Sequence, residues 1–69
     1  MGSKRLGERI LALRERKGLR QIDLAIAADV SPATISTLER GLSDPTLPTL
    51  QKLVAVLEVT LDELAGGDA

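Results

Sequence analysis

Apolar residues recur at helical spacing along nearly the whole chain, and this periodicity limits what the chain can fold into. Leu6, Ile10 and Leu13 stand at i, i+4 and i+7, so they lie on one face of a helix. No stretch alternates apolar and polar residues over enough positions to predict a strand. The pattern therefore predicts an all-α fold, and a chain of 69 residues suffices for one domain, residues 1–69, with a small core.

Capping signals separate three helices in the first part of the chain. Gly18 ends a helix expected over residues 4–17, and a short second helix is expected over residues 21–28. A third helix is expected over residues 32–40, because Ser31 is a suitable N-cap and proline is tolerated at the first helical position.

Two further helices are expected in the second part. Thr46 can cap a fourth helix, and Thr60 and Glu63 form a capping box that opens a short fifth helix. The core of the domain is then expected to span residues 4–65, followed by a frayed tail over residues 66–69. The residues of the fourth helix expected to face inward are Leu50, Leu53, Val54 and Leu57, and the fifth helix is expected to run through Leu61 and Leu64.

The residue types that the chain lacks exclude several functions. The sequence has no Cys and no His, so zinc sites, disulfides, thiol nucleophiles and imidazole catalysis lack the side chains they need. We therefore expect no enzyme activity, no metal and no cofactor. Phe, Tyr and Trp are also absent, which disfavours RNA and single-stranded nucleic acid, because proteins usually bind these by stacking. No apolar run is long enough for a membrane span or a signal peptide, which predicts a cytoplasmic protein with no membrane partner.

Charge is distributed unevenly along the sequence. Residues 1–20 carry seven basic and two acidic side chains, a net charge of +5, whereas residues 21–69 have a net charge of −6. One interpretation is two solvated faces of opposite sign. The other is a basic end that contacts a polyanion.

The third helix is predicted to have an unusual outer face. At about 100° per residue, Ile35 and Leu38 point to the core. The opposite side carries small or hydroxyl side chains and one cation: Ala33, Ser36, Thr37 and Arg40. Solvated helix faces usually carry Glu, Lys and Gln, which favour helices more strongly. A slim face with hydroxyl groups suits instead a groove of limited width.

Residues 21–40 have the spacing of a helix-turn-helix. Two short helices are joined by a turn of about three residues, and Ala25 is a small residue where the second of them would cross the first. Counted from Gln21, Ala25 is the fifth residue, Ile35 the fifteenth and Leu38 the eighteenth. These are the positions that such a unit needs for close packing.

Five stretches follow one another in a specific order and spacing over residues 6–64: LGERI, LRERKGLRQIDLA, VSPATISTLERG, DPTLPTLQKL and VTLDEL. In this order they resemble the Cro/C1-type (XRE-like, phage repressor-like) family of helix-turn-helix DNA-binding domains. The resemblance implies a compact five-helix, lambda-repressor-like domain. It also implies a sequence-specific transcriptional regulator of bacterial or phage type, such as a repressor, whose partner is double-stranded DNA. Helix 32–40 would enter the major groove, and a homodimer would bind a palindromic operator, in association with the nucleoid.

The resemblance implies specific DNA contacts. The base-reading positions are Gln21, Pro32, Ala33, Ser36 and Thr37, and the phosphate contacts are Arg20, Gln21, Ser31 and Arg40. Arg14 and Glu39 match a family pair in which an arginine of the first helix and a glutamate of the third form a partly buried ion pair. The helical pattern supports this pair independently, because it places Glu39 beside the core positions, and a carboxylate there needs a partner.

Some positions depart from the family pattern. Arg20 replaces the Thr or Ser that usually caps the second helix, so a side-chain acceptor is lost. Asp29 and Glu58 stand where the family commonly has a helix-ending glycine. The backbone there either adopts the left-handed conformation or follows another route.

Ile22 and Ile26 occupy positions that the family fills with polar residues, one turn apart on the second helix. Scattered exposure is one interpretation, and a surface for a protein partner is the other. The alternative function is therefore a protein-interaction module, antitoxin-like or an adaptor, with weak DNA binding. The dimer surface is expected in the region of the fourth and fifth helices, at Leu57, Val59, Leu61 and Leu64.

Overall fold

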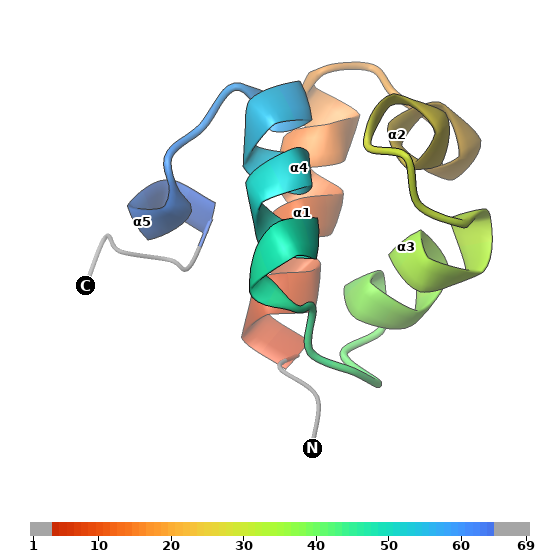
Figure 1. The fold of residues 1–69 in the computed structure, drawn as a ribbon, viewed down its shortest axis with the longest axis vertical. Coiled ribbons are helices and arrows are strands. Elements are labelled where there is room, and N and C mark those ends of the chain that lie inside the picture. Colours follow the sequence, from red (N-terminus) through yellow and green to blue (C-terminus); the bar gives the residue numbers. More distant parts are fainter. Residues whose placement is uncertain (1–3, 65–69) are drawn as a thin grey trace.

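The computed structural model describes residues 4–64, and these form five helices and no strand. The helices are α1 (Lys4–Arg16), α2 (Gln21–Ala27), α3 (Pro32–Glu39), α4 (Leu47–Leu57) and α5 (Leu61–Leu64) (Figure 1). The all-α, five-helix prediction is confirmed, and each of the first three helices ends one residue before its expected limit. Residue 65, the expected end of the core, and the expected tail over residues 66–69 lie outside the described residues. Within residues 4–64, no helix combines the length and the hydropathy that a bilayer-spanning segment needs.

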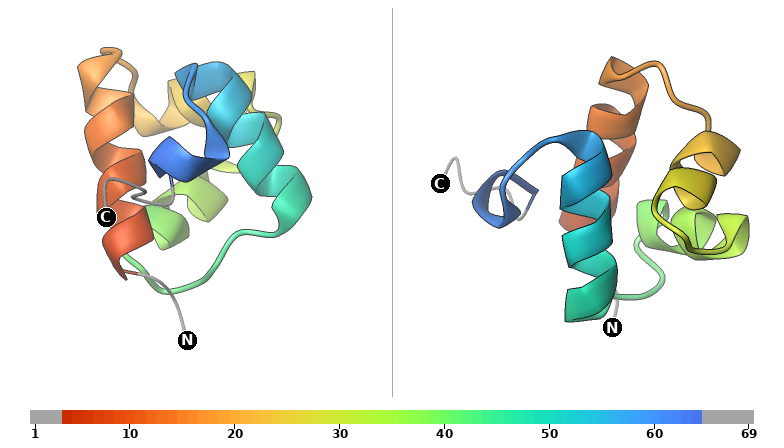
Figure 2. Two further views of the ribbon diagram at one scale, coloured as in Figure 1. Left: turned by 90° about the vertical axis from the view of Figure 1, so that its left-hand side faces the viewer. Right: turned by 45° about the horizontal axis from the view of Figure 1, so that its top comes forward.

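The helices are arranged on two sides of a central pair. α2 and α3 lie on one side of α1 and α4, and α5 lies on the other side (Figure 1, Figure 2). α1 contacts both α3 and α5, and α4 contacts both α2 and α5. The predicted helix-turn-helix thus occupies one face of the domain, and the short α5 occupies the opposite face.

The core is built from aliphatic side chains. Its buried members are Ile10, Leu24, Ala25, Ala28, Ile35, Leu38, Leu53, Leu57 and Leu64. The expected inward positions Leu50 and Val54 are partly buried and pack against this cluster. Leu61 of the short α5 is 43% exposed.

Side-chain caps determine where three of the helices begin. Ser31 and Thr46 each accept a hydrogen bond from the amide three residues later, at 3.1 and 3.3 Å. The Thr60 amide donates to the Glu63 carboxylate at 2.9 Å, and the Glu63 amide donates to the Thr60 hydroxyl at 3.1 Å. These hydrogen bonds confirm the predicted caps. The caps could be predicted because each depends on only four consecutive residues.

α1 and α3 approach each other closely at Gly7. A Cβ atom at this position would lie 2.3 Å from the carbonyl oxygen of Leu38 and 2.7 Å from that of Glu39, which is closer than such atoms can come. The missing side chain therefore lets the start of α1 lie directly on the end of α3.

Two residues keep a left-handed backbone although neither is glycine. Asp29 has a φ of 57° and Glu58 has a φ of 59°. This conformation costs an ordinary residue roughly 1–2 kcal/mol, and Asp tolerates it better than Glu does. The alternative of another backbone route is therefore wrong at both positions.

Candidate nucleic-acid interface

A close crossing of α2 and α3 holds the helix-turn-helix together. Ala25 of α2 and Ile35 of α3 are completely buried, as their positions in the sequence predict. In the turn, the Val30 amide donates to the carbonyl oxygen of Ala25 at 2.9 Å. The packing of α2 against α3 thus holds α3 in place and leaves its outer face toward the solvent.

The outer face of α3 carries small side chains that differ in hydrogen-bonding capacity. Pro32 and Ala33 are exposed, and Ser36 and Thr37 are half-buried. The Thr37 hydroxyl donates to the carbonyl oxygen of Ala33, one turn earlier, at 2.7 Å. Because its proton is used in this way, Thr37 can only accept a hydrogen bond from a ligand. The Ser36 hydroxyl makes no hydrogen bond to a residue that the structure describes, so it can donate or accept.

Polar groups stand at both ends of this face. Ser31 is exposed, and its hydroxyl lies 2.8 Å from that of Thr34 in addition to capping the helix. Arg40 is exposed and follows the last residue of α3. The amides at the start of a helix and a guanidinium at its end both suit phosphate groups.

Arg14 and Glu39 form a buried ion pair beneath the helix-turn-helix. Arg14 Nε donates to Glu39 Oε2 at 2.6 Å, and Arg14 Nη2 donates to Glu39 Oε1 at 3.2 Å. The side chains are only 11% and 4% exposed. The hydrogen bond to Glu39 raises the pKa of Arg14, although burial by itself lowers it. The two residues that the sequence predicts to pair are thus in contact, and Arg14 serves the protein interior.

Gln21 joins the same network, which the sequence does not predict. Its Nε2 donates to Glu39 Oε1 at 2.8 Å across 18 positions of the chain. Because a carboxylate can only accept, this contact determines which way the Gln21 amide is turned. Its oxygen and one amide proton remain for a ligand. No local signal could have found this contact, since only the packing of α2 on α3 brings the two side chains together.

Arg20 is paired with Asp23 at the start of α2. Its Nε donates to Asp23 Oδ2 at 2.9 Å, its Nη2 donates to Oδ1 at 3.0 Å, and its amide donates to Oδ2 at 2.8 Å. The hydrogen bond from the guanidinium lowers the pKa of Asp23 to about 2. Asp23 thereby forms one half of a capping box, because its carboxylate accepts from the Arg20 amide, whereas the side-chain acceptor that Arg20 cannot provide is not replaced. The acidic residue three positions after the cap was the sequence signal for this contact. The Arg20 side chain is 79% exposed, so a ligand can still reach it.

Several basic side chains of the N-terminal segment serve other contacts. Lys17 forms an ion pair with Glu58, and its hydrogen bond lowers the pKa of that carboxyl group. Arg9 donates to the main-chain oxygen of Glu63 in α5 at 2.8 Å. Arg14 is buried as well, so Arg9, Arg14 and Lys17 do not contribute to the outer face of α3. These three contacts therefore do not support the interpretation that the basic N-terminal segment as a whole contacts a polyanion.

The predicted dimer surface is wrong for two of its four residues. Leu57 is 4% exposed and Leu64 is 1% exposed, so both belong to the core of the single chain. The physical reason is that the short α5 packs against α1 and α4, and Leu64 and Leu57 belong to the same buried cluster. Leu61 is exposed and Val59 is half-buried, so these two remain available.

The exposed apolar pair on α2 is present as the sequence predicts. Ile22 is 40% exposed and Ile26 is 73% exposed. They lie outside the core, so their role as a partner surface stays a prediction.

These features define a class of protein: an all-α domain whose second and third helices form a helix-turn-helix unit with a slim exposed face. A family model described as helix-turn-helix matches residues 10–64. The chain belongs to this helix-turn-helix family, and the resemblance to Cro/C1-type domains is confirmed.

Similar proteins are regulators by name rather than enzymes. The chain is 43% identical over 63 residues to the HTH-type transcriptional regulator DdrOP3 of Deinococcus deserti, which covers 91% of this chain and 49% of that protein. The chain spans between 40% and 49% of the length of three such curated relatives.

Two similar structures contain DNA. SinR, a protein of Bacillus subtilis, has been solved in complex with DNA and matches with a TM-score of 0.84 and 36% identity, over 87% of this chain and 97% of that one. The P22 c2 repressor in complex with a synthetic operator matches with a TM-score of 0.82 and 36% identity, over 86% and 89%.

Proposed function

We propose that this chain binds double-stranded DNA sequence-specifically and regulates transcription, with α3 in the major groove. The observation that carries the proposal is the outer face of α3, which is slim and accessible and has Ser31 and Arg40 at its ends. Such a face fits a groove that admits a helix. The DNA in the SinR and P22 c2 complexes supports the proposal.

Sequence readout rests on few short side chains. Ser36 donates to or accepts from a base edge, and Thr37 accepts only, because its proton is held by the helix. The methyl group of Ala33 and the ring of Pro32 suit thymine methyl groups. Gln21, whose Nε2 is held by Glu39, presents its oxygen to a base amino group. With so few contacts, DNA shape carries the rest of the selectivity.

Phosphate contacts come from Ser31, Arg40, Arg20 and the remaining amide proton of Gln21. To contact a phosphate group, the Arg20 guanidinium either binds it while it stays paired with Asp23, or leaves Asp23 and binds the phosphate instead. The net charge of the chain is −1 and its pI is ≈ 5.2. Non-specific binding is therefore weak. Only Arg20 and Arg40 among these residues are cations, so a dimer neutralises about four phosphates, which predicts a slope of log K against log salt of roughly −4.

A homodimer on a palindromic operator completes the proposal. Two α3 helices then enter successive major grooves about 34 Å apart. Leu61 and Val59 are the part of the expected dimer surface that is accessible in the single chain. Such a regulator acts in a bacterial or phage-type cytoplasm, associated with the nucleoid when it is bound.

Selection from a random duplex pool, with the bound fraction sequenced at low and near-physiological salt, tests the proposal. We expect a two-fold symmetric motif that disappears in Ser36→Ala/Thr37→Ala. The control Gln51→Ala, at an exposed position of α4, should keep the motif. Circular dichroism shows whether each variant is folded. Retention without a motif, or no retention at either salt, contradicts specific binding.

A second candidate is a protein-interaction module, which the exposure of Ile22 and Ile26 favours. Apolar partner binding should hardly change with salt, whereas DNA binding should weaken steeply. The variant Ile22→Glu/Ile26→Lys should fold normally and lose the partner. An unchanged oligomeric state and partner profile would remove this candidate.

A further inference from the structure

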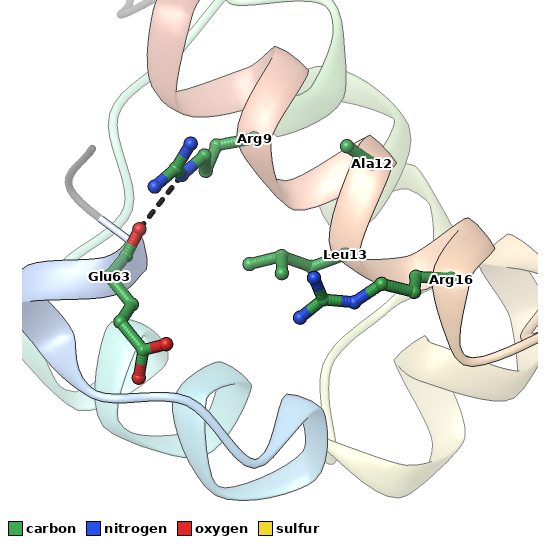
Figure 3. Close-up of a pocket in the computed structure, with 5 residues that line it drawn as sticks. All are labelled: Arg9, Ala12, Leu13, Arg16 and Glu63. Atoms are coloured by element: carbon green, nitrogen blue, oxygen red, sulfur yellow. Dashed lines mark hydrogen bonds between the residues drawn. The ribbon is translucent and has the colours of Figure 1, made fainter. Parts of the chain in front are cut away.

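A hollow is lined by residues of α1 and α5. α5 lies on the side of α1 away from the helix-turn-helix (Figure 1, Figure 2). Its volume is about 230 Å³. The residues that line it are Arg9, Ala12, Leu13, Arg16 and Glu63 (Figure 3). The first four stand at i, i+3, i+4 and i+7, so they form one stripe along α1, and Glu63 comes from α5. None of the five belongs to the proposed DNA interface.

Two of the polar side chains around this α1–α5 hollow are held in place. Arg9 Nε donates to the main-chain oxygen of Glu63 at 2.8 Å, and the terminal nitrogens of the guanidinium have no partner within residues 4–64. Glu63 Oε1 accepts from the Thr60 amide at 2.9 Å, and Oε2 accepts from no other residue that the structure describes. Leu13 packs against the core and forms an apolar wall. The donor Arg9, the acceptor Glu63 and the apolar side chain of Leu13 are thus already held in position without a ligand.

Arg16 adds an unpaired cation. Its side chain reaches into the hollow from α1, across from the Glu63 carboxylate (Figure 3). It makes no ion pair or hydrogen bond within residues 4–64, whereas the adjacent Lys17 is paired with Glu58. Two guanidinium groups and one carboxylate give the hollow a net charge of +1, which attracts an anion.

We propose that the α1–α5 hollow binds a small aliphatic α-amino acid. The planar guanidinium groups of Arg9 and Arg16 match the geometry of its carboxylate. Glu63 repels a second negative charge and pairs with the ammonium group. Leu13 and Ala12 contact the aliphatic side chain, and Ala12 is too small to fill the space itself. The hollow is smaller than a site for a drug-sized molecule, of roughly 300–1,000 Å³, and suits a ligand of this size.

Titration of the ¹⁵N-labelled chain with L-leucine, followed by NMR of the backbone amides, tests the proposal. We expect saturable shifts in residues 9–16 and 60–64 and none on α3, with a Kd on the order of 1 mM, because so small a ligand makes few contacts. Two analogues of leucine test the contribution of each charged group: 4-methylpentanoate lacks the ammonium group, and 3-methylbutylamine lacks the carboxylate. Each should bind at least fivefold more weakly than leucine.

Matched variants test the location. Ala12→Met fills the hollow from an exposed helical position, and Ala55→Met makes the same change at an exposed position of α4. The first should weaken leucine binding at least tenfold, and the second should not. Arg16→Gln should also weaken it, without a change in the folded spectrum.

Other results would overturn the proposal. Shifts that do not saturate, or that persist in Ala12→Met, would show that leucine does not occupy the hollow. Equal binding of 4-methylpentanoate or inorganic phosphate would show general attraction of anions and no recognition of an amino acid.

Discussion

Removing one partner of the Arg14–Glu39 pair should destabilise the domain more than removing both. In Arg14→Met, the Glu39 carboxylate is 4% exposed and keeps only the hydrogen bond from Gln21. An unpaired buried charge costs about 3–5 kcal/mol. A domain of 69 residues has a free energy of unfolding of only about 3–10 kcal/mol. Arg14→Met and Glu39→Leu should therefore each lose a large part of the stability.

The double variant Arg14→Met/Glu39→Leu buries no charge, so its loss should be smaller than either single loss, and smaller than their sum by at least about 2 kcal/mol. Urea unfolding followed by far-ultraviolet circular dichroism measures these values, since the chain is helical and has no aromatic residue to report by fluorescence. Arg40→Met, at an exposed position, is the control. Two results would refute a role of the buried charge: a urea midpoint of Arg14→Met no lower than that of the control, or a loss of stability in the double variant equal to the sum of the two single losses.

Four further predictions follow from single positions. Gly7→Ala should lower the free energy of unfolding by about 2 kcal/mol or more, because its Cβ would overlap the end of α3; an unchanged urea midpoint would contradict that close approach. Glu58→Gly should be more stable than Glu58→Ala by about 1 kcal/mol, because both lose the ion pair with Lys17 but only Gly relieves the left-handed backbone; equal thermal unfolding of the two variants would show that the turn is unstrained. The pKa of Asp23 is about 2 in the folded state, against an ordinary 3.8, so its contribution to stability is complete above about pH 4 and is lost as the pH falls through 2. Asp23→Asn should therefore flatten the dependence of the melting temperature on pH in this window, and an unchanged profile would argue against the pair. Arg40→Ala should weaken binding to all duplexes alike and make the salt slope shallower by about 2, because the dimer loses one phosphate contact in each monomer; fluorescence anisotropy of labelled duplexes measures this, and a changed base preference would contradict its phosphate role.

The helices could be predicted because their signals are local. The caps at Ser31, Thr46 and Thr60 depend on a side chain and an amide three residues away. The burial of Ile35 and Leu38 follows from helical periodicity alone. Even the Arg14–Glu39 contact could be predicted, because the family resemblance supplied a partner for a carboxylate that periodicity placed beside the core.

The candidate site could be predicted only in part. Periodicity identifies the residues on the outer face of α3, but not that the Thr37 proton is bound to the Ala33 carbonyl oxygen. The pairing of Arg20 with Asp23 was missed, although both residues lie within one helical turn. The family resemblance predicts a phosphate contact for Arg20, whereas within the single chain its guanidinium pairs with the Asp23 carboxylate.

By itself, the sequence determined the fold class, the positions of the helices and the apolar face of each. Only the tertiary structure decided what covers those faces. It placed Leu57 and Leu64 in the core of one chain, turned Gln21 toward Glu39, and directed Arg9 and Arg16 toward α5. The physical reason is that helical periodicity is a property of neighbouring residues, whereas the partner of a face is selected by packing between segments far apart in the chain.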